Sequence, residues 1–142
     1  MRTAIVMIAM LTFLVAPPDD AWEPDPAEVT ALAQTLYGEC RGCSELQQRA
    51  VCWCVFNRVE DNRFPDTVLG VITAPSQFHG YSPYNPVWDS LYDVAYSCLL
   101  DWHNGENRIL SPGMCWFSGD GRINRFRNAY EEQYVTERWA EE

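Results

Sequence analysis

Basic side chains are scarce in this sequence of 142 residues, which has ten Lys and Arg, twenty Asp and Glu, and only two His. The formal net charge at neutral pH is −10. Proteins that bind nucleic acid neutralise its phosphates with Lys and Arg, so this balance argues against a nucleic-acid partner. The acidity by itself identifies no other partner.

The apolar run at residues 4–16 is too short to span a membrane, because as a helix it would extend about 20 Å against a hydrocarbon core of about 30 Å. Behind Arg2 it has the length of a secretory signal, although no small-x-small cleavage motif precedes Pro17. A buried N-terminal helix is the alternative, but Pro17 and Pro18 would separate it from the rest of the chain. We therefore expect residues 1–21 to be an export signal or an N-terminal membrane anchor. The protein would then be secreted, periplasmic or in the cell wall, with membrane contact only through this segment if it is retained.

The remainder of the chain shows no internal repeat, no low-complexity tract and no sign of a second domain. We expect residues 22–142 to form one domain, which is long enough to bury a core without help. Aromatic residues make up 13% of the sequence and include six Trp. Their flat faces serve both protein cores and sugar-binding clefts.

Six cysteines are present: Cys40, Cys43, Cys52, Cys54, Cys98 and Cys115. An even number in an exported protein allows disulfides, but the sequence leaves their pairing open. Cys52 and Cys54 would point to opposite sides of a helix, so they could not pair with each other there.

Two kinds of cysteine chemistry are disfavoured. The spacing of Cys40 and Cys43 is that of a zinc half-site, but no second matched pair exists and exported proteins seldom keep reduced thiolates. The conceivable further ligands are Cys52, Cys54, His79 and His103. A nucleophilic pair such as Cys40 with His79 lacks the local signature of a cysteine peptidase. We therefore expect neither a metal site nor another cofactor.

A helix is predicted from Asp25, which can cap it, with Pro26 at the first helical position. Glu39 falls at the edge of its apolar stripe, where partial desolvation would favour the neutral, proton-carrying carboxyl. Gly38 and Gly42 bracket this acid and are expected to end the helix and turn the chain. The stripe follows helical spacing and consists of Val29, Leu32, Ala33 and Leu36.

A second helix is predicted from the capping-box pattern of Ser44 and Gln47 to about Val59. This helix carries apolar residues on nearly all its faces, which is typical of a central buried helix. Asn57 would lie on a buried side, where its amide must be hydrogen-bonded, so we expect it to anchor a loop near the site. Its neighbour Arg58 is expected to be more exposed.

A short helix is predicted to start at residues 64–67 and to run to about Thr73, and a long helix to run from Asn85-Pro86 to residues 103–105. The stripe of the long helix is expected to be core: Trp88, Leu91, Ala95, Cys98 and Trp102. Residues 114–117 and 122–127 are typical of two strands around a turn at 118–121, and residues 129–140 of a terminal helix or loop. The predicted fold class is mainly α (α+β).

Carboxylate chemistry suits this sequence better than cysteine chemistry. Glycosidic cleavage needs an acid to protonate the leaving oxygen, and usually a second carboxylate as base or nucleophile. Glu39 is the best candidate acid by its position. Asp120, Asp61 and Asp66 are candidate partners, although Asp120 is typical of a turn and the other two of helix starts. One acid suffices where the substrate supplies its own nucleophile, as in lytic cleavage of peptidoglycan.

Several spaced motifs occur in a recognisable order. Residues 32–42 contain Tyr37-Gly38-Glu39 in a segment similar to A-x-x-x-Y-G-E-A-R-G, and residues 50–59 are similar to A-V-x-x-V-x-N-R-V. Residues 63–68, the Gln77-Phe78 pair and the turn at residues 116–121 come next. Over roughly residues 30–127 the chain thus resembles the SleB-type cell wall hydrolases, the spore-cortex-lytic enzyme family with relatives in phages.

The resemblance implies a lysozyme-like helical domain with a small β-hairpin near its C-terminus. It implies a glycosidase that cleaves peptidoglycan glycan strands between N-acetylmuramic acid and N-acetylglucosamine. Glu39 would protonate the glycosidic oxygen and then take a proton from the muramic C6 hydroxyl. That hydroxyl would close a 1,6-anhydro ring, which is the reaction of a lytic transglycosylase.

The resemblance also assigns binding residues. Gln77 and Phe78 match the cleft motif and would hold sugar by amide hydrogen bonds and ring contact. The residues expected to support the site are Tyr37, Asn57 and Arg58. Tyr81, Trp116 and Phe117 are further candidates for lining the cleft, although each is more readily explained as core.

Cys40 and Cys43 depart from the family's pattern, which has small or acidic residues at these positions. A bridge between them would alter the loop that holds Glu39. Two other functions stay open: a non-catalytic peptidoglycan-binding module on a degenerate scaffold, and a hydrolase that uses water as its nucleophile.

Overall fold

The computed structural model describes residues 21–128. The expected export segment, apart from its last residue, and the expected terminal element at residues 129–140 lie outside this range. Among the described residues, no helix combines the length and the apolar character needed to cross a membrane.

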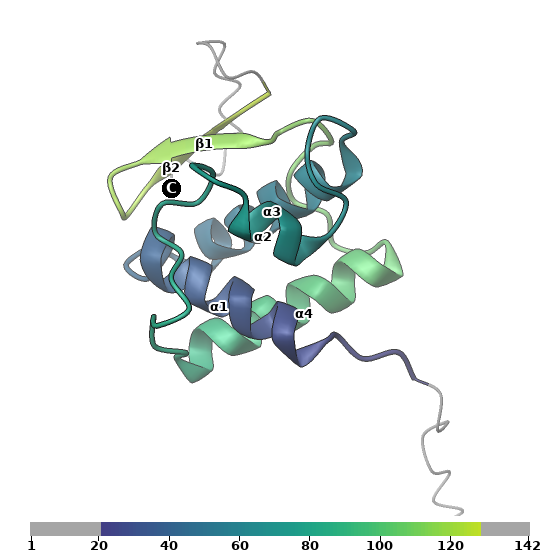
Figure 1. Cartoon of the computed structure of the whole chain (residues 1–142), viewed down its shortest axis with the longest axis horizontal. Coiled ribbons are helices and arrows are strands. Elements are labelled where there is room, and N and C mark those ends of the chain that lie inside the picture. Colours follow the sequence, from purple (N-terminus) through teal and green to yellow (C-terminus); the bar gives the residue numbers. More distant parts are fainter. Residues whose placement is uncertain (1–20, 129–142) are drawn as a thin grey trace, which may run out of the picture.

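Four helices and a two-stranded antiparallel hairpin make up the described chain (Figure 1). In order they are α1 (Pro26–Cys40), α2 (Glu45–Glu60), α3 (Val68–Thr73), α4 (Asp89–Asn104), β1 (Trp116–Gly119) and β2 (Asn124–Arg127). In the strand register, Trp116 lies opposite Arg127 and Gly119 opposite Asn124. The prediction of a mainly helical domain with a small hairpin near the C-terminus is confirmed.

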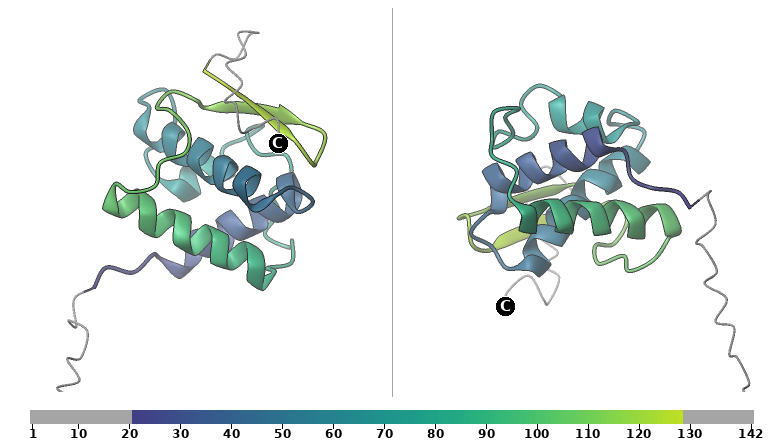
Figure 2. Two further views of the ribbon diagram at one scale, coloured as in Figure 1. Left: turned by 180° about the vertical axis from the view of Figure 1, so that it is seen from behind. Right: turned by 90° about the horizontal axis from the view of Figure 1, so that it is seen from below.

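The hairpin lies on one side of the helices, and the loop between α3 and α4 passes the C-terminal end of α1 (Figures 1 and 2). Helix α2 is central, because it packs against α1, α3, α4 and β1. Its buried apolar residues include Trp53 and Phe56, as expected of a helix with apolar residues nearly all round. Leu46 is the exception, with 37% of its surface exposed.

The predicted starts of α1 and α2 are confirmed by their caps. The Asp25 carboxylate accepts the N–H of Ala27 at 2.8 Å, and the Ser44 hydroxyl accepts the N–H of Gln47 at 3.3 Å. The Gln47 carboxamide, the other group of the predicted capping box, reaches the hairpin, where its Oε1 accepts the N–H of Asn124 at 3.0 Å. Gln47 therefore attaches β2 to α2.

Helix α4 begins at Asp89, three residues later than Pro86. Leu91, Ala95 and Cys98 are buried as expected. The prediction was wrong for Trp88, which is 46% exposed because it lies at the N-cap before the helix turns toward the core. Trp102 is half-buried, with its ring stacked on Phe56 at 4.6 Å.

The hairpin turn is displaced two residues toward the C-terminus from the predicted position at 118–121. Asp120 causes this displacement, because its Oδ1 accepts the N–H groups of Arg122 and Ile123 and so nucleates the turn there. Gly121 is next, with φ of +87°, a left-handed conformation that favours glycine. Met114 and Cys115 accordingly precede the strand.

Candidate functional site

Glu39 lies in the last turn of α1, half-buried as the sequence predicts. Its Oε1 accepts a hydrogen bond from the backbone N–H of Gly80 at 2.8 Å. Glu39 is one of the residues that line a cavity of about 290 Å³ between the end of α1 and the turn of the hairpin. The residues around this cavity are Gly38, Glu39, Cys40, Arg41, Gly42 and Gly121.

Gly38 does not end α1, which continues to Cys40, so that prediction was wrong. Its role is steric: a Cβ atom at position 38 would overlap the carbonyl group of Gly80. In the same way, a Cβ atom at Gly80 would lie 2.6 Å from the carbonyl carbon of Gly38. The two glycines let the backbones touch, and this contact brings the Gly80 N–H to Glu39.

The loop that carries Gly80 is tied to α1 by two amide side chains. Asn85 Nδ2 donates to the carbonyl groups of Gly80 at 2.8 Å and Gln34 at 3.0 Å. Gln34 Nε2 in turn donates to the carbonyl groups of Pro83 at 2.9 Å and Asn85 at 3.2 Å. Sequence reasoning missed both residues. The signal that could have found Gln34 is its place one turn before Gly38, beside the apolar stripe of the helix.

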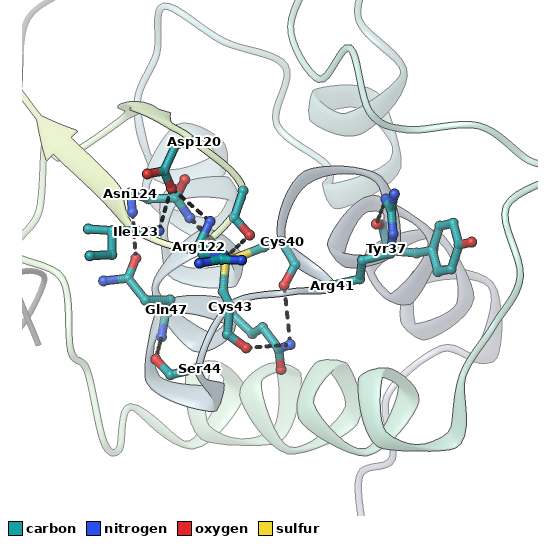
Figure 3. Close-up of a disulfide and its surroundings, with 12 residues drawn as sticks. Tyr37, Cys40, Arg41, Cys43, Ser44, Gln47, Asp120, Arg122, Ile123 and Asn124 are labelled. Carbon is teal, nitrogen blue, oxygen red and sulfur yellow. Dashed lines mark hydrogen bonds between the residues drawn. A yellow bond between two sulfur atoms is a disulfide. The ribbon is translucent and has the colours of Figure 1, made fainter.

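A disulfide joins Cys40, the last residue of α1, to Cys43 in the following turn (Figure 3). The turn itself is held to α2, because Gln48 Nε2 donates to the carbonyl groups of Cys40 at 3.2 Å and Cys43 at 3.3 Å. The buried side chain of Asn124 in β2 points its Nδ2 at the bridge, 3.2 Å from the Cys40 sulfur and 3.7 Å from the Cys43 sulfur.

The other four cysteines, Cys52, Cys54, Cys98 and Cys115, are free and buried. Burial raises the pKa of the Cys54 thiol to about 12. The pKa of Cys52 is raised by its hydrogen bond with Cys98 and by burial, and burial also raises that of Cys115. The thiols of Cys52, Cys54 and Cys115 are therefore protonated at neutral pH and behave as small apolar side chains. Within residues 21–128, no group of three or more His, Cys, Asp and Glu side chains is placed to hold a metal ion.

Arg58 is buried, with 4% of its surface exposed, so the prediction of an exposed side chain was wrong. Its Nε donates to the carbonyl of Cys115 at 2.6 Å, and its Nη1 donates to Oε1 of Gln77 at 2.7 Å. The guanidinium lies over the rings of Phe64 and Phe78, 5.0 and 4.8 Å from their centroids. Hydrogen bonds and flat ring faces together allow this cation to be buried.

Asn57 anchors a loop, as predicted. Its Nδ2 donates to the carbonyl groups of Ser111 at 2.9 Å and Met114 at 3.1 Å, and its Oδ1 accepts from Arg108 at 2.6 Å. Asn57 therefore fixes the segment between α4 and β1. Through that segment it fixes the start of the hairpin.

The predicted cleft residues lie near one another but do not line the Glu39 cavity. Gln77 is exposed and bound to Arg58, whereas Phe78 is buried, with its ring 6.2 Å from that of Phe117. Tyr81 and Phe117 are half-buried and pack against the core. Trp116 is half-buried beside Phe64, with the Arg63 guanidinium 5.1 Å from its ring centroid.

Tyr37 lies away from the disulfide and the hairpin turn (Figure 3). Its ring meets Trp88 edge-on at 5.1 Å and carries the Arg41 guanidinium 4.8 Å from its centroid. The position of Tyr37 is that of a packing residue between α1 and the start of α4. Any support that it gives to Glu39 passes through the helix.

None of the three candidate second carboxylates lines the Glu39 cavity. Asp120 holds the hairpin turn. Asp61 caps the C-terminal end of α2, rather than starting a helix, and pairs with Arg63 at 2.6 Å. Asp66 is exposed just before α3. Glu39 is thus the single carboxylate among the described residues around this cavity.

These residues define a small helical domain in which the half-buried Glu39 is the single acidic residue among the described residues that line an open cavity, an arrangement suited to general acid–base chemistry. The family model described as Cell Wall Hydrolase matches residues 42–139, and the chain belongs to this cell wall hydrolase family of the SleB type. The matched stretch begins after Glu39.

The similar proteins are spore cortex-lytic enzymes. One from Oceanobacillus iheyensis is 36% identical over 78 residues, which cover 55% of this chain and 28% of that protein. One from Bacillus cereus is 35% identical over 78 residues, which cover 55% of this chain and 30% of that protein. The chain thus spans less than a third of the length of these curated relatives. The crystal structure of the catalytic domain of the Bacillus cereus SleB protein is 30% identical and covers 66% of this chain and 71% of that chain, with a TM-score of 0.49.

Proposed function

We propose that this chain cleaves peptidoglycan as a lytic transglycosylase, with Glu39 as general acid and base. The bond broken joins N-acetylmuramic acid to N-acetylglucosamine. The observation that supports the proposal is that Glu39 is half-buried, fixed by the Gly80 N–H, and the single carboxylate among the described residues of its cavity. Membership of the cell wall hydrolase family supports the choice of substrate.

The reaction uses one acid twice. Protonated Glu39 gives its proton to the glycosidic oxygen while the bond from that oxygen to C1 of muramic acid breaks and positive charge develops at C1. The carboxylate then takes the proton of the muramic C6 hydroxyl, and the C6 oxygen bonds to C1 to close the 1,6-anhydro ring. Glu39 ends the cycle protonated, so neither water nor a second carboxylate takes part.

The surroundings of Glu39 suit this double role. The Gly80 N–H holds Oε1, and no other residue in the described part of the chain donates a hydrogen bond to the carboxylate. Oε2 is therefore available to the glycosidic oxygen and later to the C6 hydroxyl. A positioned acid of this kind contributes about 10²–10⁴-fold to the rate.

We assign sugar binding to Gln77 and Phe78, with Tyr81, Trp116 and Phe117 beside them. Gln77 is exposed, and because Arg58 holds its Oε1, its amide N–H₂ group is oriented to donate to a sugar. Phe78 is 6% exposed, so it acts mainly as a support under Gln77. A further cavity of about 380 Å³ on the hairpin, lined by Ser118, Gly119, Asp120, Ile123 and Arg125, offers the extra length that a glycan strand needs.

Export is part of the proposal, because peptidoglycan lies outside the cytoplasmic membrane. We propose that residues 1–21 direct this export and are either removed or kept as an anchor. The same segment would provide the protein's contact with the membrane if it is kept.

The test is the Glu39→Gln variant of the full chain, assayed for release of soluble muropeptides from purified peptidoglycan. We expect wild-type folding by circular dichroism and a loss of activity of at least about 10²–10⁴-fold, since the amide cannot transfer the proton. The matched control is Glu106→Gln, which neutralises an exposed glutamate after α4 and should keep full activity. Undiminished lysis by Glu39→Gln would reject Glu39 as the acid.

Mass spectrometry of the wild-type products tests the nucleophile. A 1,6-anhydro muramic end supports the transglycosylase. A reducing muramic end would mean that water is the nucleophile. Binding to sedimented peptidoglycan without any released product would mean a non-catalytic binding module.

A further inference from the structure

The Cys40–Cys43 disulfide joins the ends of the loop at residues 40–43, which is one wall of the Glu39 cavity, and it lies beside the hairpin turn, which is the other wall (Figure 3). We propose that this disulfide and the Asn124 side chain position the hairpin turn as a wall of the cavity, so that reduction of the bridge opens the wall and weakens glycan binding. The inference rests on the proposed function, and it adds a residue pair and a redox dependence to that site.

The contacts from the hairpin to the bridge are direct. Asn124, with 2% of its surface exposed, directs its Nδ2 at both sulfurs, at 3.2 and 3.7 Å. The carbonyl oxygen of Gly121 lies 3.5 Å from the Cys43 sulfur, and it would lie 3.1 Å from a Cβ atom at Gly42. The turn therefore rests on the bridged loop at Cys43, and a side chain at position 42 would be tight against the Gly121 carbonyl.

The loop that carries the bridge is itself fixed. Gln48 Nε2 donates to the carbonyl groups of Cys40 and Cys43, and the Cys43 N–H donates to the Cys40 carbonyl at 3.0 Å. The disulfide closes this short loop at both ends. Its sulfurs thus offer Asn124 a docking point of defined position, which two separate thiols with free rotation would not offer.

The acid is held by a different set of contacts. Glu39 is oriented by the Gly80 N–H, and Gly80 is fixed by its contact with Gly38 and by Asn85. None of these contacts involves the bridge or the hairpin. Loss of the disulfide should therefore raise KM by displacing the wall and change kcat little, because the proton donor stays in place.

The redox step is an exchange of two electrons. A dithiol reductant such as dithiothreitol breaks the S–S bond, leaves Cys40 and Cys43 as thiols and becomes a cyclic disulfide itself; a disulfide donor reverses the step. Cys43 is half-exposed, so the reductant can approach the bridge from the side of this residue. The remaining four cysteines are already thiols and buried, so the reductant has one target.

The experiment compares full-length wild type and the Cys40→Ser/Cys43→Ser variant, each with and without dithiothreitol. It measures KM and kcat on soluble glycan strands and amide hydrogen exchange at residues 119–124. We expect KM to be about three- to tenfold higher in the reduced wild type than in the oxidised wild type, as for the loss of one or two hydrogen bonds. The double variant should show the same increase without reduction. Exchange in the turn should become faster, and dithiothreitol should have no effect on the double variant.

Asn124→Ala provides a second test in which the disulfide stays intact, and it should also raise KM without lowering kcat. Unchanged KM and unchanged exchange after reduction would overturn the inference. A fall in kcat at constant KM would also overturn it, since it would mean that the bridge positions the acid. Glu39→Gln separates the two proposals: if that variant is inactive while reduction has no effect, the proposed function stands and this inference fails.

Discussion

Glu39 is oriented by one backbone N–H, and the position of that N–H depends on the absence of two side chains. Gly38 and Gly80 lie in van der Waals contact through their backbones. Any larger residue at position 38 would push the Gly80 loop away, and the N–H bound to Glu39 would move with it. Gly38 therefore acts on the acid through the loop.

Gly38→Ala should lower activity far more than its loss of folding stability alone would. The added Cβ overlaps the Gly80 carbonyl, and a displacement of about 1 Å at a reacting group can cost about 10²-fold in rate. The measurement is kcat for muropeptide release beside the thermal midpoint.

The control for Gly38→Ala is Gly105→Ala. Gly105 has φ of +68° with nothing within 4 Å of an added Cβ, so alanine is destabilising by about 1 kcal/mol through backbone strain alone, away from Glu39. Equal losses of activity in the two variants would mean that Gly38 matters only for stability.

Helix α2 connects the parts of the site that are far apart in sequence. It is apolar nearly all round, and its buried polar side chains reach several other segments of the chain. Gln47 holds the hairpin, Gln48 the bridged loop, Asn57 the segment before β1, and Arg58 both Cys115 and Gln77. The element that forms most of the core thus also sets the positions of the cavity walls.

Arg58→Met should destabilise the protein by roughly 1–3 kcal/mol, because the carbonyl of Cys115 and Oε1 of Gln77 lose their donor. Arg58→Lys should not keep the wild-type stability. The guanidinium is a planar fork that donates in two directions and lies flat on Phe64 and Phe78, and an ammonium lacks this fork. Urea unfolding measures the free energy of unfolding.

The matched control for Arg58→Met is Arg63→Met, which removes an exposed guanidinium paired with Asp61. This change should cost at most about 1 kcal/mol. A larger effect of Arg63→Met than of Arg58→Met would contradict the assigned role of the buried guanidinium.

At the scale of the whole molecule, the chain has twenty acidic residues and ten basic ones. The dependence of its stability on acid pH therefore tests how its carboxyls are held in the folded state. Two carboxyls, those of Asp61 and Asp120, have lowered pKa values in the folded state. Hydrogen bonds from Arg63 lower the pKa of Asp61 to about 2, and backbone N–H groups of Ile123 and Arg122 lower that of Asp120. In the unfolded chain both return to about 3.9.

A lowered folded pKa gives stability that is complete above the unfolded pKa and is lost as pH falls through the folded pKa. The Asp61→Asn/Asp120→Asn variant should therefore be less stable than wild type at pH 6, and the difference should shrink between about pH 4 and pH 2. Thermal midpoints measured from pH 6 to pH 2 check this. A difference that widens on acidification would contradict the assignment.

The helices, the caps of α1 and α2, the central place of α2 and the presence of the hairpin were predictable from the sequence, because they depend on local patterns. Asp25 and Ser44 cap their own helices, and the spacing of Leu32 and Leu36 sets which face of α1 is buried. The half-burial of Glu39 follows from the same periodicity. The family motif supplied its candidate role as the acid, and family membership is now shown by the match over residues 42–139.

Only the tertiary structure decided how the site is built, because its contacts join residues far apart in the chain. Nothing near Gly38 in sequence indicates that Gly80 packs on it, and nothing near Arg58 shows that Gln77 and Cys115 compensate its burial. The pairing of Cys40 with Cys43, and the docking of Asn124 on that pair, likewise depend on where the hairpin folds back. Local patterns fix which face of a helix is buried, but the partner that covers it is set by the packing of the whole domain.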